Sequence, residues 1–406
     1  MSRGKRTEEG ASPMSALASL FRRVGRFCAE HKRVVLAAGV SVVTLAIVLV
    51  VVLALNDGEP ADVVVTPSGT HADGTDAPAP EPSEPEPEVV VFEHINPLTG
   101  LYFTNDESVG LRRPISVMHN NSYNPGGRHH ALPMFGIGQA DIIYEVLAEG
   151  ATTRMLALYQ DLSKLPKIGA VRSTRTYYLE LSLAYDAVLV HVGQSPQAQR
   201  EMREWGMEHI DGITQPASNF WRDYTGRAGV GSEHAMFTSG EVLMGLFGQK
   251  TRHEVDNTFD NGLHFGATET VPSGEMAGKV AVPFARNGKR TTFDFDSDDG
   301  LYYVGQYNAP FVDGEDNKQV AVTNVLVLQT SVGLIPGDKE GRLRVDLQSG
   351  GSGYYICSGQ YVPITWERGG LREPFRYFTT DGEPLQMNPG KTYACVIGNN
   401  LEPTFE

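Results

Sequence analysis

Residues 140–161 read ADIIYEVLAEGATTRMLALYQD, with an apolar run on each side of Glu149-Gly150. Helix and strand compete for such a stretch, but the β-branched and aromatic residues around the Glu-Gly pair favour two strands. We therefore predict an antiparallel hairpin that turns at Glu149-Gly150. With the turn centred there, Glu145 lies directly opposite Arg154, where opposite charges attract across the strand pair. A shift of one residue in register would separate the two side chains.

Segments that read as strands or helices lie on both sides of this hairpin. Short apolar runs indicate strands, and runs that follow a capping residue indicate helices. Together these elements predict a mixed α/β domain over residues 93–268. The elements expected are strands at 114–118 and 187–192, helices at 173–184 and 196–205, the second capped by Ser195, and a helix that starts at the capping box Thr238-Ser239-Gly240-Glu241.

Residues 275–406 have a different pattern, in which short apolar runs alternate with turns rich in Gly and Pro. This pattern is typical of a barrel or a sandwich and predicts a mostly-β C-terminal domain. GATETVPSGEM (266–276) interrupts the apolar pattern, so we place the boundary between the two domains near residue 270. The expected fold class is α+β, with both domains following a single transmembrane helix.

The expected transmembrane helix is VVLAAGVSVVTLAIVLVVVLAL at 34–55, a run without charge. Such a helix is about 33 Å long, close to the thickness of the hydrocarbon layer. Residues 1–33 carry eight Lys or Arg against three acids, whereas residues 56–92 carry no Lys or Arg. The basic segment 1–33 is therefore expected in the cytoplasm, which makes this a single-pass protein of the cell membrane with its bulk extracytoplasmic. A cleaved signal peptide is the alternative, although its apolar region would be only about 7–15 residues.

Residues 56–92 form a Pro-rich acidic linker with seven prolines and nine acids. Its apolar content is too low for a core, so we expect a semi-rigid spacer. The net charge of the chain is −15, and these nine acids account for much of it. The remaining chain is only mildly acidic, without the clustered basic residues of a nucleic-acid surface.

The strongest candidate site is Arg172-Ser173-Thr174-Arg175, which follows a strand-like run and opens a helix. Free N–H groups and the helix dipole favour an anion at a helix start. Arg172 and Arg175 are three residues apart and share one face, and a guanidinium binds carboxylate or phosphate in a bidentate manner. The alternative is that both arginines pair with nearby acids such as Glu180 or Asp186. Arg154 and Glu145 are expected to line the same cleft.

The stretch His191-Val-Gly-Gln-Ser195-Pro196 ends a buried strand and opens a helix. Strand ends of this kind commonly carry sites, so His191 and Ser195 are candidate ligand-binding residues. The turn resembles a nucleophile elbow but lacks the second Gly of the motif. Ser195 reads more naturally as a helix cap. His191 is either a general base or a hydrogen-bonded core histidine.

No metal site and no cofactor are predicted. His119, His129 and His130 could hold zinc, but no HExxH or CxxC spacing supports this. The acidic stretch 294–300 resembles the start of a calcium loop, with its Gly one place late and Gly305 where Glu is required. A polar hairpin turn explains the same residues.

Cys357 and Cys395 both lie in strand-like stretches of the part expected outside the cell. They are candidates for a disulfide across neighbouring strands, which would persist in that compartment. They could equally remain two buried thiols, because sequence does not give the Cα separation.

Several motifs in order resemble the YerB-like family of exported bacterial proteins. They include NPLTG (96–100), RRPISVMHNN (112–121), ADIIYEVLAEGATTRMLALY (140–159), IGAVRSTRTYYLELSLAYDAVLVHVG (168–193), NVLVLQ (324–329), GSGYYICSGQYVPITW (351–366) and PGKTYACV (389–396). The resemblance covers about residues 93–401. It implies an α/β domain followed by a β-rich domain outside the membrane. The family has unknown function, so it implies no reaction, cofactor or catalytic residue.

The leading hypothesis is an extracytoplasmic binding protein of the cell envelope. Its expected ligand is an anionic wall polymer, or an envelope protein of the wall-assembly machinery, held by Arg172 and Arg175. A hydrolase of envelope glycan or phosphodiester is the alternative, with Glu145 or Glu149 and His191 as acid and base. A protein-interaction scaffold is a third hypothesis, which exposed Tyr354, Tyr355 and Trp366 would favour and their burial would oppose. Whether the chain is an enzyme is left open.

Overall fold

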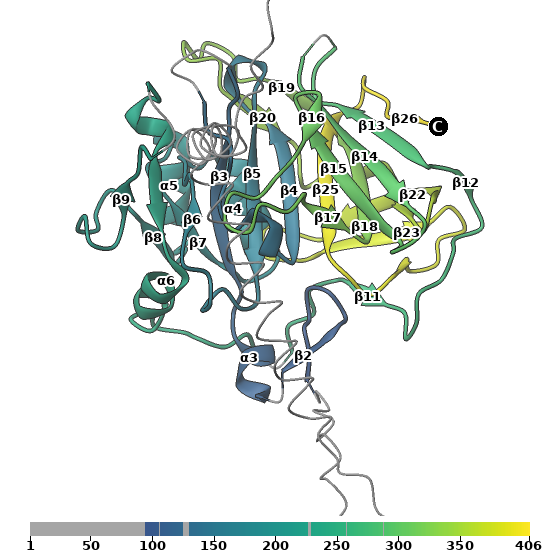
Figure 1. The fold of residues 1–406 in the computed structure, drawn as a ribbon, viewed down its shortest axis with the longest axis horizontal. Helices are drawn as coiled ribbons and strands as arrows, with labels where there is room; N and C mark the ends of the chain where they lie inside the picture. Colours follow the sequence, from purple (N-terminus) through teal and green to yellow (C-terminus); the bar gives the residue numbers. More distant parts are fainter. Residues whose placement is uncertain (1–93, 105, 125–129, 226–228, 257, 287) are drawn as a thin grey trace, which may run out of the picture. The chain divides into compact units, whose positions relative to one another are not determined.

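The computed structural model describes residues 94–104, 106–124, 130–225, 229–256, 258–286 and 288–406, which fold as one compact unit (Figure 1). The predicted basic segment 1–33, membrane helix 34–55 and linker 56–92 lie outside these residues. Among the residues that are described, no helix is both long and apolar enough to span a bilayer.

A large mixed sheet organises the described chain. The predicted hairpin lies near its middle as β4 (Ile142–Leu147) and β5 (Thr153–Tyr159), which pair antiparallel. β4 also pairs in parallel with β25 (Thr392–Gly398), so segments about 250 residues apart lie side by side. The full strand order is β12 (Glu275–Met276), β22 (Gln360–Arg368), β21 (Gly351–Cys357), β18 (Asn324–Thr330), β25, β4, β5, β3 (Ile115–Asn121), β7 (Val188–His191) and β8 (His209–Asp211), with β23 (Phe375–Thr379) paired to β22.

A second sheet of six strands covers part of the first and lies at the right of Figure 1. The acidic stretch 294–300 turns between two of its strands, since Asp296 pairs with Leu301 and Gly300 has a φ of 74°. Its members are β16 (Ala309–Pro310), β15 (Leu301–Gln306), β14 (Arg290–Asp296), β13 (Lys279–Pro283) and β26 (Thr404–Phe405), with β17 (Ala321–Val322) paired to β15.

Shorter ladders complete the strand pairing. They are β1 (His94–Ile95) with β2 (Tyr102–Thr104), β6 (Ile168–Gly169) with β10 (Met236–Thr238) and β9 (Trp221–Arg222), β11 (His264–Phe265) with β24 (Gln386–Met387), and β19 (Val332–Leu334) with β20 (Leu343–Val345).

Four short α-helices occur in the described residues, and three of them correspond to predicted helices, although α4 starts at Thr176, three residues later than expected. Ser195 caps one helix by accepting from the Ala198 N–H. Ser239, one residue after the expected cap Thr238, accepts from the Val242 N–H of another. The helices are α3 (Glu107–Leu111), α4 (Thr176–Leu183), α5 (Pro196–Glu204) and α6 (Gly240–Phe247), and the 3₁₀ turns are η1 (Ile137–Gln139), η2 (Glu149–Ala151) and η3 (Ser232–His234).

The core lies on both faces of the large sheet, because alternate residues of each strand point to opposite sides. On one face, Met155 and Ala157 belong to the cluster that contains Phe293 and Val304 of the six-stranded sheet. On the other face, Leu156 belongs to the cluster that contains α4. Burial on both faces explains why β5, β18 and β25 contain apolar runs without strict alternation.

The predicted fold class, α+β with a transmembrane helix, an α/β domain and a mostly-β domain, is wrong. The described chain is mostly β, with four helices of five to nine residues, and the transmembrane helix finds no support in it. The large sheet also runs across the boundary expected near residue 270, because β25 is inserted between β18 and β4. Local patterns identify the strands, but they carry no information about which distant strand completes a sheet.

Candidate functional site

The carboxyl ends of β3, β4 and β7 meet at one edge of the large sheet. β3 and β4 both run antiparallel to β5, and β7 runs parallel to β3, so all three point the same way. We call this the carboxyl edge. Ligands of open α/β sheets commonly bind outside such an edge, because the loops that follow several strands converge there.

An arginine cluster lies at this edge, and we define it as Arg154, Arg172 and Arg175 with the carboxylate of Glu149. Arg154 stands near the start of β5, and its Nη2 lies 3.2 Å from Oε2 of Glu149. Nη2 of Arg175 donates to the same oxygen at 3.1 Å, and its Nε donates to Oε1. Burial works against the charge of Glu149, but the hydrogen bonds from Arg175 and the charge of Arg154 outweigh it and lower the pKa of Glu149.

Arg172 has a different environment from the other two arginines. Its Nη1 donates to the main-chain oxygen of Glu233 at 3.0 Å, and the Glu233 carboxylate attracts it electrostatically. Burial, followed by repulsion from Arg154, lowers the pKa of Arg172 to about 10. Arg172 and Arg175 are half-buried. Three guanidinium cations thus lie near two carboxylates, those of Glu149 and Glu233, so the net charge of this region is positive.

The main chain holds this segment in place against the loop that leaves β7. Oγ of Ser173 donates to the carbonyl of Val192 at 3.0 Å, and the N–H of Thr174 donates to the carbonyl of Gly193 at 3.0 Å. The Ser173 carbonyl in turn accepts from Nη1 of Arg154 at 2.8 Å. The expectation that residues 172–175 and the loop after His191 share one neighbourhood therefore agrees with this geometry.

Neither His191 nor Ser195 is arranged for nucleophilic catalysis. The His191 ring is buried, with Nε2 at 2.9 Å from Nδ1 of His209 and Nδ1 at 2.9 Å from the carbonyl of Gly193. Burial lowers its pKa to about 4, so the ring is neutral at pH 7. Ser195 is buried and its hydroxyl oxygen caps α5. His191 is a hydrogen-bonded core histidine and Ser195 a helix cap.

Glu145 does not join the arginine cluster. The turn centres on Gly150 itself, and not between Glu149 and Gly150 as expected. Glu145 therefore lies opposite Met155, and Val146 lies opposite Arg154. The expected pairing of Glu145 with Arg154 is wrong, because this shift puts the two side chains on opposite faces of the sheet.

Instead, Glu145 is fully buried between the two sheets. Its Oε1 lies 3.1 Å from Nζ of Lys289, and its Oε2 accepts from the hydroxyls of Thr291 and Tyr393, both at 2.6 Å. Burial raises the pKa of Glu145, but the charge of Lys289 and these hydroxyls outweigh it, so the pKa is lowered overall. This group is an ion pair of the core.

The strand registers also separate Glu145 from His191. Met155, opposite Glu145, pairs with His119 of β3, which shares its face with Val117. Val117 pairs with Val190, so the adjacent His191 points to the other face. A general acid and base must converge on one cleft, and these two do not.

Tyr354, Tyr355 and Trp366 do not form an exposed aromatic surface of the kind that a protein-interaction scaffold would need. Tyr355 and Trp366 are buried, and only Tyr354 is half-buried. The hydroxyl of Tyr355 donates to the side chain of Asn324 at 2.8 Å, which ties it to the core.

The candidate zinc and disulfide residues are dispersed. His119 is buried and contacts the hydroxyl of Tyr159 at 3.3 Å, and His129 lies outside the described residues. Within the described part of the chain, no group of three or more His, Cys, Asp or Glu is placed to hold a metal. Cys357 and Cys395 are free thiols, because β18 separates their strands and the registers put them on opposite faces. The candidate disulfide is therefore not formed.

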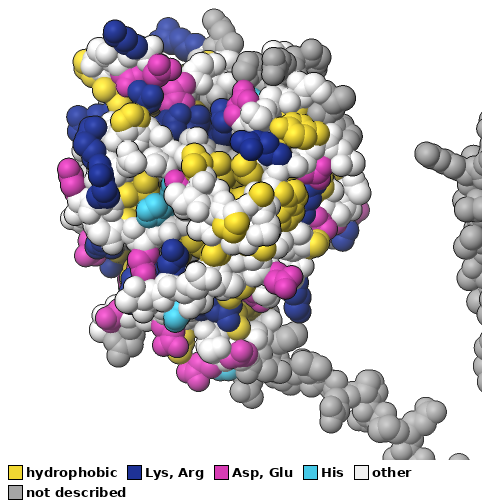
Figure 2. Space-filling model, turned by 90° about the vertical axis from the view of Figure 1, so that its left-hand side faces the viewer, with side chains coloured by type: hydrophobic (Ala, Val, Ile, Leu, Met, Phe, Trp, Pro, Cys, Tyr) yellow, Lys and Arg dark blue, Asp and Glu magenta, His cyan; other side chains and the backbone are white. Residues whose placement is uncertain are grey.

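Charge is unevenly distributed over one side of the molecule. α3, which precedes β3, lies at the bottom of Figure 1, so the carboxyl edge lies toward the top. On the side that carries α5 and α6, Lys and Arg side chains gather most densely in the upper half, among Asp and Glu side chains (Figure 2). Basic groups are thus concentrated toward one end of this side but interrupted by acids.

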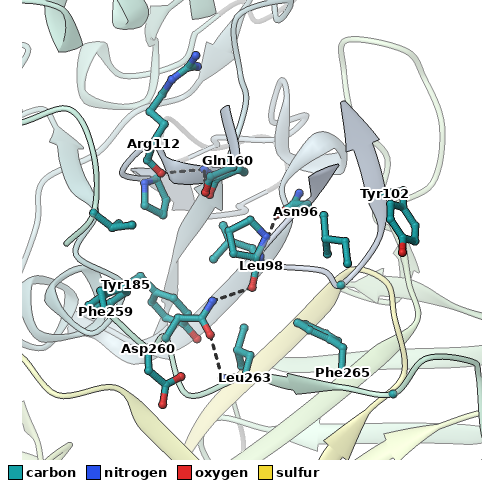
Figure 3. Close-up of a pocket in the computed structure, with 18 of the residues that line it drawn as sticks. Asn96, Leu98, Tyr102, Arg112, Gln160, Tyr185, Phe259, Asp260, Leu263 and Phe265 are labelled. Carbon is teal, nitrogen blue, oxygen red and sulfur yellow. Dashed lines mark hydrogen bonds between the residues drawn. The ribbon is translucent and has the colours of Figure 1, made fainter. Parts of the chain in front are cut away.

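A pocket that the sequence does not predict lies at the opposite edge of the sheet (Figure 3). We call this the amino edge, because β3 and β4 begin there. The walls of the pocket come from residues 95–102 and 255–267, which are distant in sequence. The only signal in the sequence is the pair of turn motifs NPLTG (96–100) and DNG (260–262), which read as loops and not as a site.

Comparison with known proteins agrees with the resemblance. Residues 98–253 match the N-terminal domain, and residues 280–394 the C-terminal domain, of a family described as "Protein of unknown function (DUF3048)". The chain is 31% identical over 305 residues to "Putative lipoprotein YerB" of Bacillus subtilis (strain 168), a match that covers 74% of this chain and 85% of that one. The crystal structure of YerB protein from Bacillus subtilis matches with a TM-score of 0.63 and 27% identity, over 77% of this chain and all of that one. The chain belongs to the YerB-like family.

Proposed function

We propose that this chain is an extracytoplasmic protein of the bacterial cell envelope that binds the carboxylate or phosphate groups of an anionic wall polymer. The name of its relative, "Putative lipoprotein YerB", supports the location. The arginine cluster at the carboxyl edge supports the binding function. An envelope protein that presents acidic groups is the second partner class from the sequence, and the experiment below distinguishes the two.

The observation that carries the proposal is a pair of guanidinium groups that share one carboxylate, with a third guanidinium close enough to repel them. Arg154 and Arg175 converge on Glu149, and Arg172 repels both electrostatically. An anion would relieve this repulsion. Since all three side chains are already partly withdrawn from water, binding would remove little further hydration from them.

Arg172 is the most suitable first contact. Its Nη1 donates to a main-chain carbonyl rather than to a carboxylate, so the guanidinium can turn to a ligand without breaking an ion pair of the cluster. Arg175 stands at the N-cap of α4 without a side-chain cap bond, so an anion there also lies near the positive end of a helix. Guanidinium forks bind carboxylate and phosphate in a bidentate manner.

The test is binding of the purified full-length chain to isolated wall material, measured as the fraction that sediments with it. We expect Arg172→Ala to weaken binding about tenfold and the Arg172→Ala, Arg175→Ala double variant more strongly, because a hydrogen bond to a charged group contributes about 1.5–3 kcal/mol. Arg344→Ala is the matched control, because Arg344 is an exposed arginine of β20.

Two comparisons make the result decisive. If the polymer is the ligand, the chain should no longer bind wall material from which the anionic polymers have been removed. If the chain still binds this material and captures an envelope protein from it, the protein partner is favoured. A double variant that keeps its circular dichroism spectrum and still binds wall material with unchanged affinity would eliminate the arginine cluster as the site.

A further inference from the structure

The carboxylate of Glu149 contacts the arginine cluster in the way that an anionic ligand would. Arg175 faces it with two donors, Nε toward Oε1 and Nη2 toward Oε2 at 3.1 Å. Nη2 of Arg154 lies 3.2 Å from the same Oε2. Guanidinium groups bind free carboxylate and phosphate in this two-point manner. Glu149 therefore stands where the proposed function places an anionic group of the ligand.

The three arginines do not depend on Glu149 for their positions. Each of them also donates through Nη1 to a main-chain carbonyl, and a main-chain carbonyl keeps its place when a side chain moves. The three bonds are Arg154 to Ser173 at 2.8 Å, Arg175 to Thr174 at 2.7 Å and Arg172 to Glu233 at 3.0 Å. The cationic site is thus built by the main chain, and it persists when the carboxylate leaves.

Glu149 is the least firmly held member of this group. It lies in the turn η2 between β4 and β5, whereas Arg154 belongs to β5 and Arg175 caps α4. The tip of the turn is open, because a Cβ added at Gly150 would meet no atom of the described residues within 4 Å. The Glu149 side chain is already 18% exposed. Rotation about its own bonds can take the carboxylate into water without moving a strand.

Exchange of Glu149 for a ligand anion is close to balanced in energy. The guanidinium groups keep a negative partner throughout, so no buried cation is left uncompensated. The hydration that Glu149 regains offsets the hydration that the incoming group loses. Because Glu149 is tethered beside the arginines, its effective concentration there is high. The apparent affinity for a ligand then falls with the fraction of molecules in which the site is open.

We propose that Glu149 is an internal competitor for the anion site, which a carboxylate or phosphodiester group of the wall polymer displaces from Arg175 and Arg154. This inference rests on the proposed function and adds the regulation of its site. A ligand with one anionic group competes poorly with the tethered carboxylate. A polymer can also reach Arg172, to which Glu149 makes no hydrogen bond within the described part of the chain. The site therefore favours polyvalent anions over single ones.

The test is calorimetric binding of two defined polymers to the full-length chain, poly-L-glutamate as a carboxylate polymer and polyphosphate as a phosphate polymer. Glu149→Gln keeps the size of the side chain and removes its charge. We expect this variant to bind about tenfold more tightly than the unmodified chain, because a charged hydrogen-bond partner no longer competes. The polymer that shows the gain identifies the class of the anionic group.

Glu233→Gln is the matched control, because the Glu233 carboxylate also attracts Arg172 but does not pair with Arg154 or Arg175. The main-chain carbonyl that holds Arg172 is unchanged in this variant. We expect it to tighten binding by no more than about twofold, the effect of a partly exposed charge. An equal gain in both variants would show that only the net charge matters, and would overturn the proposal.

Binding that is weaker or unchanged in Glu149→Gln would show that the carboxylate only positions the arginines, and would also overturn the proposal. Each variant is first checked for an intact unfolding transition. If Glu149→Gln does not fold, Glu149→Asp carries the test, because a side chain shorter by one methylene group cannot hold both arginines and should also tighten binding.

Failure of this inference can be distinguished from failure of the proposed function. Polymer binding that requires Arg172 and Arg175 but ignores Glu149→Gln refutes the internal competitor alone. A gain from Glu149→Gln that persists together with Arg172→Ala and Arg175→Ala would not arise in the cluster, and also refutes it. If neither polymer binds the unmodified chain or Glu149→Gln, the arginine cluster is no anion site and both proposals fall.

Discussion

The two edges of the large sheet differ in how their chemistry is assembled. The carboxyl edge carries ionised groups contributed by two short stretches, 149–154 and 172–175. The amino edge carries an apolar pocket whose walls come from residues 95–102 and 255–267. The seven residues of β5 separate these edges by about 20 Å. A cluster of charge within a few residues can be seen in a sequence, whereas a hollow between distant segments becomes visible only after folding.

The largest expected effect concerns the buried pair Lys289–Glu145, which tests whether Glu145 belongs to the core or to the carboxyl edge. Lys289→Ala leaves the fully buried Glu145 without its cation and should cost about 3–5 kcal/mol of the free energy of unfolding, measured in urea. The double change Glu145→Gln, Lys289→Met should recover much of this loss, because no buried charge remains. Unchanged stability together with lost wall binding would place the pair in the site after all.

A smaller effect belongs to the amino edge, where burial raises the pKa of Asp141 to about 6. The unfolded chain releases this proton near its ordinary pKa of 3.8, so between about pH 4 and pH 6 the folded state binds more protons than the unfolded state. The free energy of unfolding should therefore fall as the pH rises through this window, by up to about 3 kcal/mol. Asp141→Asn should flatten that slope in urea titrations at stepwise pH, and a slope that persists would assign it to another group.

The smallest effect sharpens the description of the carboxyl edge. Ser195 accepts from the Ala198 N–H at 3.1 Å as the cap of α5, so Ser195→Ala should cost about 1 kcal/mol of the free energy of unfolding. Wall binding by the folded variant should be unchanged, because the hydroxyl faces the helix. A tenfold loss of binding with unchanged stability would restore Ser195 as a ligand-binding residue.

Much of the local structure could be predicted, because turn and capping residues act over a few positions. The strand at 114–118 is the start of β3, the helix at 196–205 is α5, and the hairpin around Gly150 is β4 and β5. The arrangement of sheets could not be predicted, since nothing near β4 specifies that β25 pairs with it.

The same limit applies to the candidate site. The structure brings the tetrapeptide 172–175 close to Arg154, whose Nη1 donates to the Ser173 carbonyl. The pairing with Glu145 that the sequence suggests for Arg154 does not occur. Glu145 was assigned to the wrong face because a half-step in the turn reverses every side chain of a strand. The role of Glu149, which joins two arginines, was missed because an apolar–polar pattern does not show where a turn residue points.

The position of β25 in the sheet affects how the chain folds during its synthesis. This strand completes the pairing of β4, although β4 is synthesised more than 240 residues earlier. Until Thr392–Gly398 is synthesised, one side of β4 presents open N–H and C=O groups that any other extended chain can engage. A nascent chain that stalls before residue 392 is therefore prone to aggregation, and the pairing of β25 ends this exposure.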